Sequence, residues 1–106
     1  MKCQICEEIR GIQSCHIVSR KFSQGTGINI ELKNIKEINF LNLCPNHHWY
    51  LDNALLTDEE FLIIKDKILN VVKPLEEKLL KNRPELVVLY REWITKRIGR
   101  DVFLSA

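Results

Sequence analysis

The stretch CPNHH at residues 44–48 sets Cys44 and His47 with two residues between them. Near the start of the chain, Cys3 and Cys6 have the same spacing. Zn2+ takes four tetrahedral ligands in structural sites, and thiolate and imidazole are among its usual donors. Each short-spaced pair can reach one ion from a tight turn, and two such turns complete the tetrahedron. The spacing therefore predicts one structural zinc ion held by these four side chains.

The competing interpretation is that the four cysteines of the chain form disulfides. No signal peptide is visible at Met1-Lys2-Cys3, so we expect a cytoplasmic protein in a reducing compartment. In such a compartment this cysteine pattern favours metal over disulfides. Cys15 is then the spare cysteine, and it is a fourth ligand in place of His47, a buried thiol, or part of a second site.

The size and charge of the chain limit the classes of function. Its 106 residues make one small domain, in which a metal ion would compensate for a modest apolar core. No apolar run approaches the roughly 18 residues that span a membrane, so we expect no membrane partner. The net charge is +2, from 16 basic and 14 acidic residues, whereas a protein that merely wraps nucleic acid is usually more basic. Any contact with phosphates is therefore expected to be local.

Two halves of different character share this expected single domain of residues 1–106. Residues 1–56 hold every cysteine and histidine, whereas residues 57–106 read as helices. In the first half we expect three elements, namely a strand within residues 14–19, a second strand within residues 35–43 and a helix over about residues 47–55. Pro45 precedes this helix, and Asn46 could cap its N-terminus.

The second half begins with a helix-start signal at Thr57. The Thr57 side chain can accept a hydrogen bond from the backbone N–H of Glu60, whose side chain can return the bond. Apolar residues then recur at helical spacing until Pro74, which we expect to break or kink the helix. After a short second piece, a last helix follows Pro84, and Gly99 is its expected C-cap.

Several residues of the first half also stand in a specific order. They are Cys3-x2-Cys6, His16-Ile17-Val18, Asn39 five residues before Cys44, and Cys44-Pro45-Asn46-His47-His48 followed by Asp52. This order over residues 3–52 resembles the HNH nuclease family, whose core is a ββα-metal fold. The expected fold class is α+β, with a small zinc-stapled ββα-metal core followed by a C-terminal helical extension.

The resemblance implies a metal-dependent endonuclease that hydrolyses phosphodiester bonds in DNA. His16 looks like the general base, and Asn39 looks like the residue that holds the loop and orients this base. His48 looks like the ligand of a catalytic divalent ion. Asp52 lies one helical turn from His48, so it could bind the same ion or orient His48. The family's separate structural zinc is matched by Cys3, Cys6, Cys44 and His47.

One position departs from the family's pattern. Many HNH proteins carry Asp or His immediately before the base as a ligand of the catalytic metal, and here that residue is Cys15. A related subgroup has a small residue such as Ala there, so Cys15 does not exclude the family. A thiolate is a poor ligand for Mg2+. The expected ion is therefore Mg2+ held by His48, Asp52, phosphate and water, or a softer ion such as Mn2+, Ni2+ or Zn2+.

Each of the implied site residues also has a purely structural interpretation. His16 could donate to a backbone carbonyl, and Asn39 could simply form a turn. His48 could replace His47 as the zinc ligand. Asp52 could be an exposed helix residue or a cap partner.

Other side chains near the motif bear on nucleic-acid binding. Arg20, Lys21 and Lys33 are close to the expected base in sequence, and they either contact phosphates or belong to the solvated surface. We expect Trp49 and Tyr50 in the core rather than stacked on bases.

Two other functions fit the same residues. The first is a non-catalytic zinc-bound DNA-binding module, which the missing acidic ligand before His16 favours. The second is a protein-interaction module whose functional surface is the helical half. We expect DNA as a partner and a homodimer formed through the helices of residues 57–98, because the last helix carries apolar residues on more than one face. If these helices pack only on one another and on the zinc unit, the chain stays a monomer.

Overall fold

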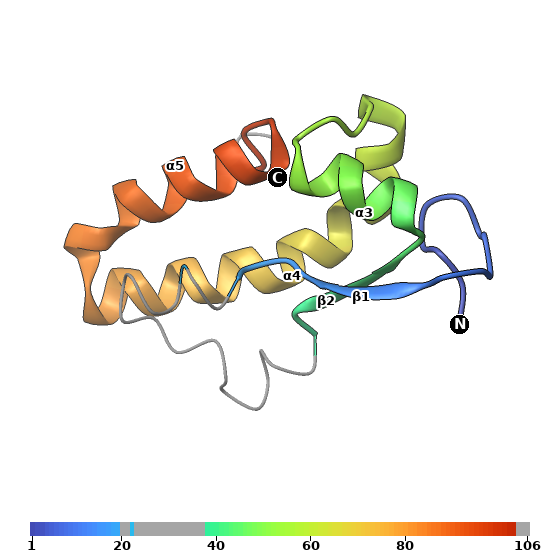
Figure 1. Ribbon diagram of the computed structural model, residues 1–106. Coiled ribbons are helices and arrows are strands. Elements are labelled where there is room, and N and C mark those ends of the chain that lie inside the picture. Colours follow the sequence, from blue (N-terminus) through green and yellow to red (C-terminus); the bar gives the residue numbers. More distant parts are fainter. Residues whose placement is uncertain (20–21, 23–37, 104–106) are drawn as a thin grey trace.

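The computed structural model describes residues 1–19, 22 and 38–103, and its architecture is α+β, as predicted (Figure 1). The described elements, in chain order, are β1 (Gln13–His16), β2 (Phe40–Leu43), α3 (Pro45–Asp52), α4 (Asp58–Asn82), the 3-10 turn η1 (Pro84–Leu86) and α5 (Val87–Ile98). The two strands and α3 lie at one end of the molecule (Figure 1). From this end α4 extends away, and α5 runs back antiparallel to it (Figure 1).

β1 and β2 form a two-stranded antiparallel sheet in which Cys15 lies opposite Leu41 and His16 lies opposite Phe40. Successive residues of a strand point to opposite faces. Cys15 and Leu41 are buried, so their face of the sheet belongs to the core. His16 and Phe40 are half-buried and share the other face, where their rings contact each other with centroids 4.6 Å apart.

The first strand is shorter than predicted because the chain leaves the sheet after His16. The backbone N–H of Ile17 donates to the backbone carbonyl of Asn39 at 3.3 Å, and the N–H of Val18 donates to the Asn39 side chain at 2.9 Å. These bonds replace strand pairing for two buried residues. The predicted second strand is confirmed over β2, and its expected start at residue 35 lies outside the described residues.

α3 begins two residues earlier than predicted, at Pro45. Proline is favourable in the first turn of a helix, where its missing N–H leaves no hydrogen bond unmade. The N-cap is Cys44, so the prediction that Asn46 caps this helix is wrong. The Cys44 side chain makes no hydrogen bond to the helix backbone, which leaves its sulfur free to face other groups.

The predicted capping box at the start of α4 is confirmed. The backbone N–H of Glu60 donates to Thr57 Oγ1 at 3.1 Å, and the backbone N–H of Thr57 donates to Glu60 Oε1 at 2.9 Å. Two backbone donors that the helix itself cannot satisfy are thus paired, which fixes where α4 starts.

We predicted a break or a kink at Pro74, and the break is wrong, because α4 continues through Pro74 as one helix of 25 residues. A proline inside a helix costs about 3 kcal/mol, since it removes one backbone hydrogen bond and crowds the preceding turn. Full burial of an aliphatic side chain contributes about 1.5–3 kcal/mol. Buried residues flank the proline on both sides, and the Tyr90 hydroxyl donates to the Val72 carbonyl at 2.6 Å. Packing against α5 therefore offsets the local cost.

The helical hairpin closes on the first half of the chain. The buried face of α5 includes Tyr90, Ile94 and Ile98. Gly99 ends the helix with a φ of 85°, which confirms the predicted C-cap. A β-carbon at Gly99 would stand 3.0 Å from Ala54, so this position needs glycine both for its backbone angle and for the close approach of the two segments.

Both helices of the hairpin leave apolar side chains on the surface. The exposed ones are Leu62, Ile63, Leu80, Val88 and Leu89. The expected homodimer through these helices stays a prediction. None of the described helices has the length and apolar character needed to cross a membrane.

Replacing Pro74 by alanine should stabilise the protein, because the substitution restores a backbone donor inside α4. We expect the free energy of unfolding to rise by about 1–3 kcal/mol, measured by chemical denaturation with circular dichroism. Pro84→Ala is the matched control, since Pro84 stands at the first position of η1, where proline suits the backbone. A Pro74→Ala protein no more stable than the parent would show that this proline carries no cost.

Candidate metal centre

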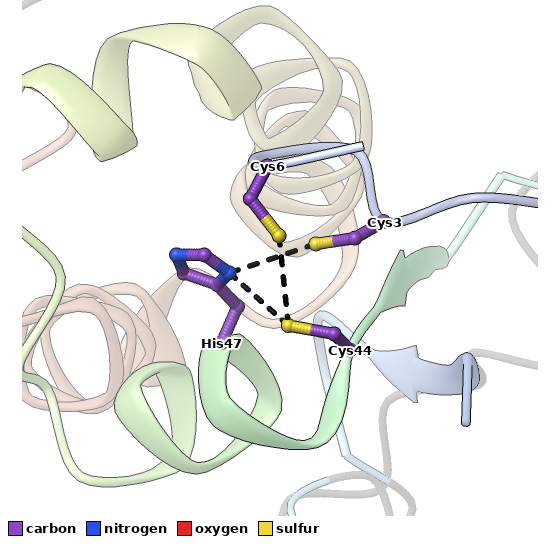
Figure 2. A group of neighbouring side chains, drawn as sticks. All are labelled: Cys3, Cys6, Cys44 and His47. Carbon is purple, nitrogen blue, oxygen red and sulfur yellow. Dashed lines mark hydrogen bonds between the residues drawn. The ribbon is translucent and has the colours of Figure 1, made fainter. Parts of the chain in front are cut away.

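Four potential metal ligands, predicted from their spacing, come together at the junction of the sheet and α3 (Figure 2). The ligand atoms of Cys3, Cys6, Cys44 and His47 all lie within 4.8 Å of one another. Two of them come from the N-terminal turn, one from the residue after β2, and one from the first turn of α3. This group is compatible with a zinc site.

The distances within the group match the edges of a zinc tetrahedron. Cys6 Sγ and Cys44 Sγ stand 3.8 Å apart, and His47 Nδ1 lies 3.3 Å from Cys44 Sγ and 3.6 Å from Cys3 Sγ. A tetrahedral ion with metal–sulfur distances of about 2.3 Å has sulfur–sulfur edges of about 3.8 Å. All four cysteines of the chain are free thiols, and a disulfide needs sulfurs about 2.0 Å apart. The geometry therefore favours metal over disulfides.

The N-terminal turn is pinned to the sheet by its backbone. The Cys3 N–H donates to the Glu8 carbonyl and the Glu7 N–H donates to the Cys3 carbonyl, which closes a tight turn around the first cysteine pair. Gln4 attaches this turn to β2, because its N–H donates to the Asn42 carbonyl and its side chain accepts from the Asn42 N–H at 2.7 Å. Strand β2 thus aligns the two ligand pairs.

The thiols of the first pair differ in acidity. Burial disfavours the Cys3 thiolate, but hydrogen bonds from the backbone of Cys44, Cys6 and Ile5 outweigh it and lower the pKa of Cys3 to about 6. A backbone hydrogen bond at Glu8 favours the Cys6 thiolate, yet desolvation and the neighbouring sulfurs raise the pKa of Cys6. At neutral pH Cys3 is therefore the ready thiolate of the pair, and the thiolate is the form that binds metal.

His47 is held by a carboxylate that the sequence analysis did not connect with the site. Its Nδ1 faces the sulfurs of Cys3 and Cys44 (Figure 2). Its Nε2 lies 2.6 Å from Glu60 Oε2. When Nε2–H donates to Glu60, Nδ1 is left as the free ligand atom. Metal-bound histidines almost always have such an outer partner. The sequence indicated Glu60 only as the capping residue of α4. The separation of 13 residues between the two side chains gave no sign that Glu60 contacts His47.

Cys15, the spare cysteine, is a buried thiol outside the metal group. It is 3% exposed, and its Sγ donates weakly to the Gln13 carbonyl at 3.7 Å. Burial, followed by the negative charge of Asp52, raises the pKa of Cys15 to about 11. Cys15 does not belong to the Cys3–Cys6–Cys44–His47 group. Of the three roles left open for this residue, the structure therefore supports the buried thiol and does not support a ligand in place of His47.

His48 and Asp52 are brought together on α3, as their spacing predicts. His48 Nε2 lies 3.1 Å from Asp52 Oδ2, and His48 Nδ1 contacts the side-chain oxygen of Gln13 on β1. Both ring nitrogens therefore have partners. Within the described residues, the Cys3–Cys6–Cys44–His47 group is the one set of three or more such side chains close enough for a metal, and His16, His48 and Asp52 do not form another.

His16 and His48 stand on different sides of the sheet. Gln13, which contacts His48, shares the core-side face of β1 with Cys15, whereas His16 is on the opposite face with Phe40. No hydrogen bond joins the His16 ring to another residue in the described part of the chain.

Asn39 is buried and clamps the chain just after His16. Its Oδ1 accepts from the Val18 N–H and its Nδ2 donates to the Val18 carbonyl, both at 2.9 Å. Asn39 therefore holds the backbone of Val18, and its role in orienting His16 stays a prediction.

Arg97 is a further residue at this junction that the sequence analysis did not connect with the site. From α5 its guanidinium donates to the backbone carbonyls of His16 and Ile17 and to the carboxylate of Asp52. In the sequence it is only one of several basic residues in a helix, about 80 residues away from its strand partners, so no local pattern signals the contact.

The remaining predicted residues have different outcomes. Arg20, Lys21 and Lys33 lie outside the described residues. The expectation that Trp49 and Tyr50 belong to the core is wrong, because both are exposed, Trp49 by 56%. Their rings contact each other edge to face at the surface of α3, which turns Leu51 into the core instead.

No protein-family model, curated protein or solved structure matches this chain.

Zinc should be bound by the purified protein at one ion per chain and lost on chelation. A hollow of about 290 Å3 borders Cys6, Cys44 and His47, so a chelator can reach the group from solvent. Because metal binding and folding are coupled in small metal-bound units, Cys44→Ala should abolish zinc binding and unfold the first half of the chain. Cys15→Ala is the matched control and should keep the ion. Metal analysis checks both variants, and stoichiometric zinc in Cys44→Ala would exclude this ligand set.

Glu60→Gln should weaken zinc binding without removing a ligand. The loss of an outer partner typically lowers metal affinity by about 10- to 100-fold. The exposed neighbour Glu59→Gln serves as the control, because it changes the same charge at the start of α4. Competition with a chromogenic chelator measures the affinity, and equal values for the two variants would show that Glu60 acts only as a helix cap.

Proposed function

We propose that this chain is a metal-dependent endonuclease of the HNH type that hydrolyses phosphodiester bonds in DNA. The observation that carries the proposal is the Cys3–Cys6–Cys44–His47 group at the end of a strand–strand–helix unit. Its ligands come from the positions that the resemblance assigns to a structural zinc. The same unit carries His16 on β1 and the His48–Asp52 pair on α3. The Cys3–Cys6–Cys44–His47 group and the sequence motif thus support the same proposal.

In the proposed reaction His16 accepts a proton from the attacking water. An imidazole can do this at neutral pH, and proton transfer by a positioned side chain contributes about 10^2- to 10^4-fold to rate. The His16 ring is half-buried against Phe40, and no described residue occupies its nitrogens. Asn39 supports this role by fixing Val18, two residues further along the chain.

His48 is the proposed protein ligand of the catalytic divalent ion, with Asp52 as its orienting partner. An ion such as Mg2+, Mn2+ or Ni2+ there would neutralise charge on the phosphate and on the leaving oxygen. Since Gln13 and Asp52 occupy the two ring nitrogens, an ion at His48 has to replace one of them. Asp52 is the more firmly held, because it also accepts a hydrogen bond from Arg97 at 3.0 Å. We therefore assign the Nδ1 side of His48, where Gln13 lies, to the ion.

A second candidate is a non-catalytic DNA-binding or protein-interaction module on the same zinc-bound scaffold. Two observations favour it. The residue before His16 is a buried thiol that offers no charged ligand, and His16 and His48 stand on opposite sides of the sheet. If the protein binds DNA without cleaving it, the DNA-binding module is the correct form. If it neither binds nor cleaves DNA, the protein-interaction module remains.

A plasmid-nicking assay with Mg2+, Mn2+, Ni2+ and Zn2+ separates these candidates. In the active protein, His16→Ala should lower the cleavage rate by about 10^2- to 10^4-fold while zinc content stays at the parent level. Ser14→Ala is the control, because Ser14 shares the face of β1 on which His16 lies. Cleavage by His16→Ala at the parent rate would remove His16 from the mechanism. A parent protein that binds DNA and cleaves with none of these ions would refute the nuclease.

A further inference from the structure

A single arginine of the last helix joins two separate parts of the first half of the chain, the end of β1 and the end of α3. Arg97 Nη2 donates to the His16 carbonyl at 2.8 Å, and Nε donates to the Ile17 carbonyl at 3.1 Å. Nη1 donates to Asp52 Oδ1 at 3.0 Å. The guanidinium therefore fastens α5 to the end of β1 and to the end of α3 at once.

The environment of Arg97 distinguishes it from a surface ion pair. Its side chain is 15% exposed, whereas that of Arg91, one and a half turns earlier on α5, is 52% exposed and pairs with Glu76 of α4. A guanidinium presents five donors in a rigid planar fork, and a lysine ammonium cannot reproduce this arrangement. Two of the acceptors are backbone carbonyls at the point where the chain leaves the sheet. Arg97 is thus built into the junction.

The acceptors of Arg97 are the groups that the proposed function needs in fixed positions. One is the backbone of His16, and the next residue along the chain is held from the other direction by the Asn39 carbonyl. The other is Asp52, whose second oxygen holds His48 Nε2. A hydrogen-bonded chain therefore runs from α5 through Asp52 to His48, and a parallel one runs to His16.

We propose that Arg97 is a positioning residue of the nuclease site, which fixes the strand end carrying His16 relative to the Asp52–His48 pair. This inference rests on the proposed function. With this role for Arg97, α5 contributes to the nuclease site in addition to packing on the core. A misplacement of about 1 Å in such a constellation can cost about 100-fold in rate, even when the fold is intact.

The test uses the zinc-loaded, full-length protein and the variants Arg97→Ala and Arg97→Lys. Arg91→Ala is the matched control, because it removes an arginine–carboxylate pair from the same helix away from the site. Amide hydrogen exchange at Ile17 and Val18 reports on the strand end without reference to activity. Exchange at both amides should be faster in Arg97→Ala than in the parent and unchanged in Arg91→Ala.

Activity is measured on the same samples. Arg97→Ala should lower kcat by about 10- to 100-fold with KM unchanged, and millimolar guanidinium should restore part of the rate. Arg97→Lys keeps a positive charge beside Asp52 and should fall between the parent and Arg97→Ala. Exchange at the parent rate, or faster exchange with an unchanged kcat, overturns the positioning role.

The failure of the proposed function gives a different result. A parent protein without cleavage refutes both the nuclease and the catalytic part of this inference. The exchange measurement then decides separately whether Arg97 holds the end of β1.

Discussion

The metal group at the start of α3 is the constraint on which the rest of the structure depends. It joins a turn at the beginning of the chain to residues some 40 positions later, and the two-stranded sheet between them has only four residues in each strand. An isolated two-stranded sheet is marginally stable at best in water. Closing a loop of this length carries an entropic cost, which a bound ion with four ligands can offset. An ion bound by this group would fix the sheet, the entry into α3 and the position of His48 together.

The helical hairpin is fastened to this unit by charged side chains as well as by its core. Glu60 at the start of α4 reaches His47, and Arg97 near the end of α5 reaches Asp52 and the end of β1. Arg100, two residues after α5, adds a third contact through the Leu56 carbonyl, and it also pairs with Asp58 at the start of α4. A polar group buried in such a contact costs free energy if its partner is lost. Polar contacts, as well as apolar burial, therefore fix how the two halves pack on each other.

Much of the fold could be predicted from the sequence where the signal was local. The capping box at Thr57 and the C-cap at Gly99 each depend on residues a few positions apart, and both are confirmed. The two short-spaced pairs predicted that Cys3, Cys6, Cys44 and His47 come together, which is confirmed, whereas the bound zinc stays a prediction. The predicted break at Pro74 failed because packing against α5 stabilises the helix, and local helix propensity takes no account of such packing. Glu60 and Arg97 were missed as site residues because their partners are 13 to 81 residues away. The catalytic assignments of His16 and His48 remain predictions that rest on the motif.

The misjudged burial of Trp49 has a practical consequence, because the chain contains only two tryptophans. Trp49 is solvent-exposed on α3, two residues after His47, whereas Trp93 packs into the hairpin with its ring 4.5 Å from that of Phe22. Their fluorescence emission should differ in wavelength, since Trp49 is 56% exposed, whereas Trp93 is partly buried and packs against the core. Each half of the molecule therefore contains one intrinsic tryptophan fluorophore. Loosening of α3 and melting of the hairpin can be followed as separate signals in one sample.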